Sequence, residues 1–413
     1  MTKRILLIAA TTGYQTRSFA EAAERLGYDV QLATDRCHQM DDPWGDRAIA
    51  LRFQEPSKAA EAIAAHGSRI DGIVAVGDRP AEIAALTAAL LRLPGNPPTA
   101  VAACRNKHRS RERFQDAGLL VPRHRLIPLT DSAAAADRYP CVLKPLGLSA
   151  SRGVIRANNP AQFNQALKRI RAILESPDIA RMHEEQDRFI QVEDFIEGRE
   201  FALEGILTRG CLDTLAIFDK PDPLNGPYFE ETLYITPSRE SSTTQAAMID
   251  ATMRAVAALG LTHGPVHAEM RVNETGVWML EVAARPIGGL CAQVLRFDDG
   301  GGLEERIIRH AAGDPQGSST LAALSRGVMM IPIPREGVYV DVAGAESARM
   351  VKCIDDVIIT AKAGQKLVPL PEGSSYLGFI FAAGDGPAQV ESALREAHAQ
   401  LKFEIASTLP VVR

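Results

Sequence analysis

The 413-residue sequence contains no apolar run long enough to cross a membrane and no excess of positive charge. A membrane-spanning helix needs roughly 20 consecutive apolar residues, and no stretch approaches that length. The formal net charge of −5 argues against a dedicated nucleic-acid binder, because such a protein presents a basic face. We therefore expect a soluble protein that has neither a membrane nor a nucleic acid as its partner.

Cysteine is present but is not arranged for a disulfide framework or a zinc site. No two cysteines form a Cys-x-x-Cys pair, and they are scattered along the chain: Cys37, Cys104, Cys141, Cys211, Cys291 and Cys353. This pattern is typical of reduced thiols, so we expect a cytoplasmic protein. Lys3-Arg4 followed by apolar residues 5–10 resembles a signal peptide only superficially, because the apolar run is short and suits a buried strand better.

The first turn of the sequence also lacks the glycine motif G-x-G-x-x-G, which argues against a Rossmann dehydrogenase. The first hundred residues nevertheless alternate between strand and helix patterns. We expect strands at residues 5–10, 30–33 and 73–76 and helices at residues 16–26 and 81–91. This alternation indicates a small parallel α/β unit, which ends at Pro94-Gly95-Asn96-Pro97-Pro98.

The rest of the chain has an α+β character, with strands joined by Gly-containing loops. Strands are expected at residues 141–143, 189–192, 328–333, 338–342 and 376–382, and helices at residues 133–136, 160–174, 244–259 and 387–401. The stretch at residues 313–319 is the best candidate linker. We therefore predict three domains, at residues 1–100, 101–315 and 316–413, the second with subdomains at residues 101–195 and 196–315.

The first group of candidate functional residues is Asn106-Lys107, which opens a predicted basic helix. The helix continues with His108, Arg109, Arg111 and Arg113. Taken alone, this segment is more simply interpreted as a solvated helical face.

The second group is Lys144, at the end of an apolar strand, followed by a loop of small residues at 147–153. Small residues let backbone N–H groups approach phosphate oxygens, and the lysine ammonium adds a compact positive charge. The order differs from a P-loop, because the lysine precedes the loop. The alternative is a plain hairpin with a surface lysine.

The third group is acidic and follows an apolar strand, in the sequence Glu193-Asp194-Phe195-Ile196-Glu197-Gly198-Arg199-Glu200. The chain turns at Gly198 and returns with Glu200. Carboxylates here suit the hydroxyls of a ribose, and the backbone suits the edge of an adenine ring. A charged β-turn is an equally good interpretation of this segment alone.

The fourth group lies on a predicted hairpin of residues 267–272 and 277–282, which places Glu269 and Glu281 on strands that can pair. Two carboxylates beside apolar residues repel each other unless a cation neutralises them, and hard oxygen ligands favour Mg²⁺. Arg285 follows, where a guanidinium suits a transferred phosphate or an acyl oxyanion. The alternative is an exposed pair of cross-strand glutamates.

Taken in order, the four groups resemble the ATP-grasp superfamily, and the resemblance covers most of the chain. No single motif is decisive, but the ordered set behind a βαβ unit is specific. The resemblance implies an ATP-grasp fold of the α/β and α+β class. It would have a βαβ (pre-ATP-grasp) domain, a nucleotide held between two α+β subdomains, and a strand-rich C-terminal domain.

The same resemblance implies ATP and Mg²⁺ as cofactors, with Mn²⁺ as a possible substitute. Lys107 and Lys144 would contact the phosphates under the loop that contains Ser149, Ser151 and Gly153. The adenine and ribose would be held by Glu193, Asp194, Phe195, Ile196, Glu200 and Leu280. Glu269 and Glu281 would coordinate the metal.

Three features are similar to one branch of the superfamily, the dipeptide-forming L-amino acid ligases. Many superfamily members have Asn two residues after the second metal carboxylate, where this chain has Ala283, and Arg285 would stabilise the acyl phosphate. Glu231 takes the place of the ligase glutamate that receives the amino group of the first amino acid. Some relatives carry His in place of Tyr234, a difference that bears on the side-chain preference for the substrate. Residues 376–385 and 390–403 resemble the closing domain of this branch.

The resemblance thus implies a carboxylate–amine ligase with Lys144, Glu231 and Arg285 as its catalytic residues. His267 is a candidate proton acceptor for the incoming amine, and a histidine of the core or of a strand is an equally good interpretation. An amino acid would be converted to an acyl phosphate and coupled to an amine, expected to be a second amino acid, giving a dipeptide, ADP and phosphate. Alternatives are an ATP-grasp carboxylase or ligase acting on bicarbonate or another carboxylate, and a non-catalytic nucleotide-binding module. Its partners would be small-molecule substrates, and a homodimer would be unsurprising.

Overall fold

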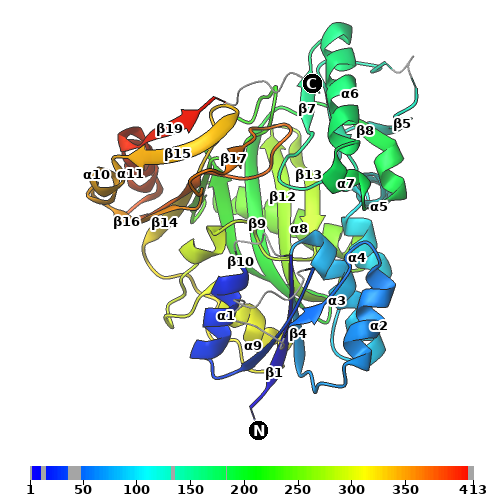
Figure 1. Cartoon of the computed structure of the whole chain (residues 1–413), viewed down its shortest axis with the longest axis vertical. Coiled ribbons are helices and arrows are strands. Elements are labelled where there is room, and N and C mark those ends of the chain that lie inside the picture. The colour runs from blue at the N-terminus through cyan, green and yellow to red at the C-terminus, as the bar shows by residue number, and fades with distance from the viewer. Residues whose placement is uncertain (1, 11–14, 36–47, 132–134, 183, 408–413) are drawn as a thin grey trace.

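The computed structural model describes residues 2–10, 15–35, 48–131, 135–182 and 184–407. Figure 1 shows an N-terminal unit (blue), a central sheet (green), a small unit that carries helix α6, and a C-terminal unit (orange to red). Within the described residues, no helix combines the length and the apolar character needed to cross a bilayer.

The N-terminal unit is built on a parallel four-stranded sheet with the strand order β3-β2-β1-β4. Its elements are β1 (Arg4–Ala9), α1 (Thr16–Arg25), β2 (Asp29–Thr34), β3 (Ile49–Ala50), α2 (Pro56–Ala65), β4 (Gly72–Val76), α3 (Asp78–Leu91) and α4 (Pro98–Cys104). Strand β1 lies between two neighbours, so its apolar residues are buried, as is typical of a parallel sheet. The three strands and two helices predicted here are confirmed, while β3, α2 and α4 were not predicted.

The small unit has an antiparallel sheet with the strand order β5-β8-β6-β7. Its elements are α5 (Lys107–Asp116), β5 (His124–Pro128), β6 (Cys141–Pro145), β7 (Ile155–Ala157), α6 (Pro160–Leu174), α7 (Pro177–Ala180), the 3-10 helix η2 (Glu185–Arg188) and β8 (Phe189–Asp194). Asn106 caps α5, because its side chain accepts a hydrogen bond of 3.0 Å from the Arg109 N–H. The predicted helix at residues 133–136 falls partly outside the described residues, and Ala135 and Ala136 are not helical.

The central sheet has eight strands in the order β13-β12-β9-β10-β11-β14-β18-β16. The elements that precede residue 316 are β9 (Arg199–Thr208), β10 (Cys211–Lys220), β11 (Leu233–Thr236), α8 (Ser242–Leu259), β12 (His263–Asn273), β13 (Gly276–Ala283), η3 (Cys291–Val294) and α9 (Leu303–Ala311). The predicted hairpin is confirmed as β12 and β13. The predicted boundary at residue 316 falls between strands of one sheet, because β14, β16 and β18 follow it in the sequence.

The C-terminal unit adds three strands to the central sheet and a separate sheet with the order β17-β15-β19. Its elements are β14 (Ser325–Ile331), β15 (Gly337–Ala343), α10 (Ala345–Arg349), β16 (Ile354–Ile359), β17 (Lys366–Leu367), β18 (Gly378–Gly384), α11 (Pro387–Gln400) and β19 (Lys402–Ala406). Helix α11 packs on the sheet through Val390 and Leu394, which are fully buried. The strands and the helix predicted in this region are confirmed to within a few residues.

One continuous apolar core fixes the relative position of the N-terminal, central and C-terminal units. It contains Phe19 of α1, Phe218 of β10, Phe379 of β18 and Phe297, which lies between η3 and α9, each 2% exposed or less. Fully burying such aromatic side chains contributes about 1.5–3 kcal/mol each. Loops from all three units are therefore held close together at the edge of this core, where the candidate site lies.

Candidate active site

A cavity of about 360 Å³ lies where the N-terminal unit, the small unit and the central sheet meet. Most of the residues singled out from the sequence line it: Lys107, Lys144, Ser149, Ser151, Glu193, Asp194, Phe195, Ile196, Glu200, Glu231, Glu269, Leu280, Glu281 and Arg285. Gly153 does not line the cavity, and its N–H instead donates a 2.9 Å hydrogen bond to the Pro371 carbonyl. The four groups that the sequence separates by up to 178 positions thus share one space.

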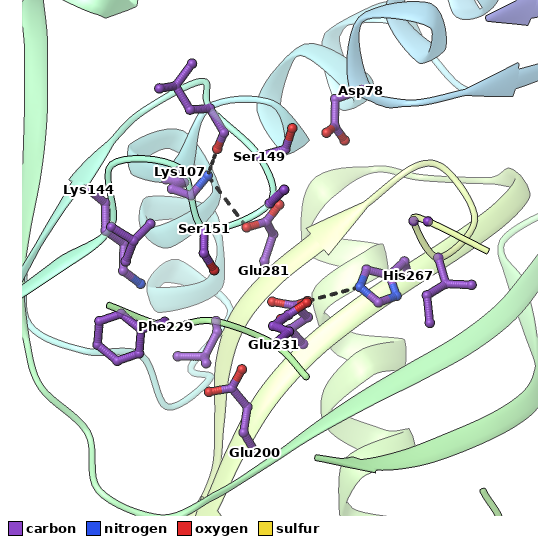
Figure 2. Close-up of a pocket in the computed structure, with 18 of the residues that line it drawn as sticks. Asp78, Lys107, Lys144, Ser149, Ser151, Glu200, Phe229, Glu231, His267 and Glu281 are labelled. Atoms are coloured by element: carbon purple, nitrogen blue, oxygen red, sulfur yellow. Dashed lines mark hydrogen bonds and ion pairs between the residues drawn. The ribbon is translucent and has the colours of Figure 1, made fainter. Parts of the chain in front are cut away.

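Lys107 stands at one end of this cavity, where helix α5 begins. Its Nζ donates a 2.6 Å hydrogen bond to the Leu148 carbonyl and lies 3.6 Å from Glu281 Oε2. Figure 2 shows this ammonium between the loop of residues 147–153 and the Glu281 carboxylate, with Ser149 and Ser151 nearby. The end of the cavity therefore combines a cation, hydroxyls and loop backbone, which are groups that suit phosphate oxygens.

Residues 147–153, called the small-residue loop from here on, contain an unusual run of backbone conformations. Ala150 and Ser151 have φ of 53° and 54°, and Gly153 has φ of 74°. Left-handed conformations at two consecutive non-glycine residues are uncommon and concentrate at ligand-binding loops. This local backbone is consistent with a loop shaped to surround a ligand.

Lys144 and Glu193 form a buried ion pair beside the cavity. Lys144 Nζ lies 2.5 Å from Glu193 Oε2, and Arg111 Nε lies 2.7 Å from Glu193 Oε1. Burial alone would raise the pKa of Glu193, but the two cations lower it to about 2. The Glu193 side chain is thus committed to Arg111 and Lys144.

Aromatic rings surround the end of strand β8. The Arg156 guanidinium lies 4.0 Å from the centroid of the Phe195 ring, and the centroids of the Phe195 and Phe229 rings are 6.3 Å apart. The neighbouring Asp194 carboxylate accepts a 2.8 Å hydrogen bond from Arg123 on the exposed side. Phe195 and Phe229 therefore give this part of the cavity an apolar wall, which suits a flat base better than a phosphate.

Three carboxylates approach one another on the floor of the cavity. Ligand oxygens of Glu200, Glu231 and Glu269 lie within 4.8 Å of one another, and elsewhere in the described residues no other such group was found. Lys220 joins them, with Nζ at 3.1 Å, 2.5 Å and 3.2 Å from these carboxylates respectively. A lysine ammonium thus already compensates this cluster.

Within this cluster, Glu231 has a hydrogen bond to a tyrosine and a raised pKa. Its Oε2 accepts a 2.8 Å hydrogen bond from the Tyr234 hydroxyl. Burial and the neighbouring Glu269 raise the pKa of Glu231 to about 7, although Lys220 opposes the shift. An additional cation at this position, such as a substrate ammonium, would favour the ionised form.

The sequence predicted that Glu269 and Glu281 lie on strands that can pair, and the register of β12 and β13 places them opposite each other, with a bulge directly after Glu269. Glu269 Oε1 faces Lys220 and His267, whereas Glu281 faces Lys107. The two carboxylates come from paired strands and both line the cavity, and they are the hard oxygen donors that Mg²⁺ prefers. The chemistry of these two carboxylates suits a divalent cation, while Glu269 already contacts Lys220 and His267.

His267 lies between two carboxylates. Its Nδ1 pairs with Glu204, and its Nε2 lies 3.1 Å from Glu269 Oε1. Burial lowers the pKa of this histidine, but the two carboxylates outweigh burial and raise it to about 9. Both ring nitrogens are thus directed at carboxylates, an arrangement that favours the protonated ring and a structural role over acceptance of a proton.

Arg285 reaches across to the N-terminal unit. Its Nε lies 3.0 Å from Asp78 Oδ1 at the start of helix α3, directly after Gly77. Burial disfavours the charged guanidinium, but Asp78 outweighs this and holds the pKa of Arg285 above its usual value. Figure 2 shows Asp78 entering the same space as Lys107 and Glu281. The pair fixes the guanidinium at the junction of two units.

Comparisons with known proteins agree with this arrangement. A family model described as an ATP-grasp domain matches residues 137–294, and one described as L-amino acid ligase C-terminal domain 2 matches residues 329–406. The chain therefore carries an ATP-grasp domain followed by an L-amino acid ligase C-terminal domain. The predicted superfamily, its L-amino acid ligase branch and the fold are confirmed.

Individual relatives of this ATP-grasp ligase point in the same direction. The crystal structure of an L-amino acid ligase from Bacillus licheniformis shares 25% identity and a TM-score of 0.80, and the match covers 98% of this chain and 99% of that chain. Carnosine synthase 1 of Gallus gallus is 28% identical over 70% of this chain and 32% of its own length. Dapdiamide A synthase of Enterobacter agglomerans is 27% identical over 46% of this chain and 44% of its own length. The chain spans between 32% and 64% of the length of the curated relatives it matches.

The sequence did not single out three charged residues of this ATP-grasp ligase site, Lys220, Glu204 and Asp78, and Arg111 was named only as part of a basic helix. Lys220 is opposite Glu200 in the register of β9 and β10, so a correct pairing of these strands would have brought it to Glu200. Asp78 follows the last residues of a strand, where side chains of a parallel sheet meet, which was an available signal. Arg111 and Glu204 are buried on elements whose contacts the sequence does not specify.

Proposed function

We propose that this protein activates the carboxylate of an amino acid with ATP and couples it to an amine, expected to be that of a second amino acid. The products would be a dipeptide, ADP and phosphate. The observation that carries the proposal is the presence of Glu231 in one cavity with Lys107, Lys144 and Arg285. A carboxylate that suits an ammonium group thus lies near cations that suit phosphate and acyl oxygens.

The ATP phosphates would lie at the end of the cavity formed by Lys107, Lys144 and the small-residue loop. This placement is supported by the two ammonium groups and by the loop hydroxyls of Ser149 and Ser151. The base would contact the apolar wall at Phe195 and Leu280, with the backbone of residues 193–196 at its edge. Glu200 would hold the ribose, although its carboxylate already contacts Lys220 and Arg271.

Glu269 and Glu281 would hold Mg²⁺, with Mn²⁺ as a substitute, since carboxylates on paired strands supply suitable oxygens. When bound, the metal neutralises charge on the phosphates and so favours attack at the γ-phosphorus. Lys220 stays outside the cavity lining and would keep Glu269 compensated from below.

The first amino acid would place its ammonium group against Glu231. Its carboxylate would then point toward Lys107 and Arg285, where one of its oxygens attacks the γ-phosphorus and ADP leaves. The amine of the second substrate attacks the carbonyl of the acyl phosphate, the C–O bond to phosphate breaks, and the amine loses a proton. Arg285, held by Asp78, would stabilise the oxyanion that forms in this step.

The proposal is tested by measuring phosphate release from Mg·ATP with single amino acids and with pairs, combined with mass detection of products. Release that requires a pair and accompanies a dipeptide mass supports the proposal. Release that requires bicarbonate or a carboxylate without an amino group would favour the alternative reactions. Binding of ATP without turnover under any of these conditions would contradict the proposed function.

A further inference from the structure

Three loops from different parts of the chain meet on the outer side of the cavity. They are the small-residue loop, residues 221–232 (the proline-rich loop) and residues 368–377 (the C-terminal loop, between β17 and β18). The small-residue loop belongs to the small unit, the proline-rich loop to the central sheet and the C-terminal loop to the C-terminal unit. Their contacts with one another decide how well the cavity is enclosed.

The small-residue loop donates two hydrogen bonds to backbone carbonyls of the C-terminal loop. The Gly153 N–H donates to the Pro371 carbonyl at 2.9 Å, and Arg152 Nε donates to the Glu372 carbonyl at 2.8 Å. Gly153 also has a left-handed φ of 74°, and an added Cβ would lie 2.6 Å from the Pro145 ring. The C-terminal unit therefore binds the small-residue loop by hydrogen bonds at the last two residues of that loop, Arg152 and Gly153.

The proline-rich loop is bonded to the segment that follows the small-residue loop. The Arg156 N–H donates to the Pro227 carbonyl at 2.9 Å, and its guanidinium donates to the Asn225 carbonyl at 2.7 Å. An isolated bridge also pairs Ile155 with Tyr228. Residues 155–156, which follow the small-residue loop, are thus paired with the proline-rich loop, which carries Glu231.

Arg169 on helix α6 joins the two outer loops to each other. Its guanidinium donates two hydrogen bonds to the Glu372 carboxylate, one of them 2.7 Å long, and another to the Tyr228 hydroxyl. It also lies 5.0 Å from the centroid of the Tyr228 ring. The Arg169 and Glu372 side chains are 41% and 38% exposed, so solvent screens the attraction between their charges. The directed hydrogen bonds from the guanidinium to Glu372 and Tyr228 therefore matter more.

The inner ends of the same loops line the cavity. Glu231 and Tyr376 lie near the ends of the proline-rich loop and the C-terminal loop, and Ser151 lies in the small-residue loop. Arg169, Glu372 and Tyr228 do not line the cavity themselves. They can therefore affect the chemistry only through the position of these loops.

We propose that Arg169, Glu372 and Tyr228 are positioning residues that hold the proline-rich loop to the C-terminal loop and, through the C-terminal loop, to the small-residue loop. They thereby keep water away from the acyl phosphate until the amine attacks it. This inference rests on the proposed function, since an acyl phosphate is the species at risk. An acyl phosphate reached by water is hydrolysed to the free amino acid and phosphate, which consumes ATP without forming an amide. The contacts thus determine how much of the ATP is converted into product.

The experiment compares phosphate released with dipeptide formed, by wild type and Arg169→Ala, on the amino-acid pair that the wild type accepts. For Arg169→Ala we expect roughly a 2- to 10-fold rise in phosphate per dipeptide, the size expected from losing a partly exposed bidentate ion pair. Glu372→Gln should act in the same direction, and Tyr228→Phe more weakly. The charge exchange Arg169→Glu with Glu372→Arg should restore part of the coupling.

Arg326→Ala is the matched control, because it removes another partly exposed ion pair, with Asp355 at 2.9 Å, within the C-terminal unit. Its ratio of phosphate to dipeptide should equal that of the wild type. An unchanged ratio in Arg169→Ala, with a reduced rate only, would overturn the inference. So would an equal rise in the Arg326→Ala control, because that would indicate general destabilisation.

Hydrogen exchange measured with ADP and Mg²⁺ separates this inference from the proposed function, because it needs no turnover. In Arg169→Ala, amides of the small-residue loop and of the proline-rich loop should exchange faster together, by several-fold, with Gly153 among them. If the wild type makes no amide but the exchange rises in both loops, the proposed function fails and the loop contacts stand. If the wild type makes dipeptide and the exchange is unchanged, the inference fails and the function stands.

Discussion

Lys220 lies directly behind Glu231, with its Nζ 2.5 Å from Glu231 Oε1. The lysine is 6% exposed and does not line the cavity, whereas Glu231 does. The same ammonium also contacts Glu200 and Glu269. One buried cation therefore compensates three carboxylates that we assign to three different ligands: the ribose, the metal and the amino group of the substrate.

Replacing Lys220 by Met should destabilise the protein strongly. Removing one partner of a buried ion pair leaves the remaining charges uncompensated and costs about 3–5 kcal/mol. Lys220→Arg keeps the charge and should cost less. The free energy of unfolding in urea measures both, with Lys58→Met, a substitution of an exposed lysine, as the control that should stay within about 0.5 kcal/mol. A loss for Lys220→Met no larger than that of the control would show that the cluster does not need this cation.

Glu231→Gln should weaken binding of the first amino acid more than binding of ATP. The variant loses a charged hydrogen bond to the substrate ammonium, worth about 2 kcal/mol, so KM for that amino acid should rise roughly 30-fold. The KM for ATP should change little. Glu230→Gln is the matched control, because Glu230 is adjacent and partly buried but does not line the cavity. Equal effects of the two variants would contradict the role given to Glu231.

Glu281→Gln should raise the requirement for Mg²⁺. The amide keeps the shape of the side chain but lacks the charge of a metal ligand, so the Mg²⁺ concentration for half-maximal rate should rise by at least about tenfold. Glu274→Gln, in the turn of the same hairpin, is the control and should leave it unchanged. A titration of the rate with Mg²⁺ measures the effect, and an unchanged midpoint in Glu281→Gln would exclude this carboxylate as a ligand.

Glu193 should make the stability of the protein depend on pH in the acid range. Its pKa is lowered from 4.5 to about 2, because Arg111 and Lys144 outweigh its burial. The carboxylate thus contributes stability above pH 4.5 that is lost as the pH falls toward 2, roughly 3 kcal/mol in all. Glu193→Gln should therefore be destabilised most at neutral pH, and its deficit should shrink as the pH falls through this window.

Unfolding free energies of wild type and Glu193→Gln between pH 2 and pH 7 measure that difference. The control is Glu197→Gln, an exposed residue four positions further along the chain. Its difference from the wild type should be small and independent of pH. A constant deficit for Glu193→Gln across the range would show that lost packing, rather than the ion pairs, explains it.

Much of the fold could be predicted because local patterns and the final structure agree. The apolar run that forms β1 and the paired hairpin of β12 and β13 are specified by short-range sequence. The positions of Lys107 and Lys144 follow from the start of a helix and the end of a strand. The turn sets the register from Val272–Val277 to Met270–Met279, and the bulge after Glu269, which the turn does not specify, brings Glu269 opposite Glu281.

Contacts between distant segments could not be predicted in the same way. Arg285 and Asp78 are 207 positions apart, and Arg169 and Glu372 are 203 apart, so no turn or periodicity relates them. Both pairs depend on how whole units pack, which long-range core contacts decide. Gly153 illustrates the same point, because its N–H faces the C-terminal loop rather than the cavity.

The measurement that tests the central claim most directly follows an oxygen atom. The accepted first amino acid is labelled with oxygen-18 in its carboxylate and incubated with ATP, Mg²⁺ and the second amino acid, and the released phosphate is analysed by mass. Because the carboxylate oxygen attacks the γ-phosphorus and leaves with the phosphate when the amine attacks, we predict one labelled oxygen in each phosphate and a dipeptide that has lost one. Phosphate without the label, formed alongside dipeptide, would contradict an acyl phosphate and with it the proposed function.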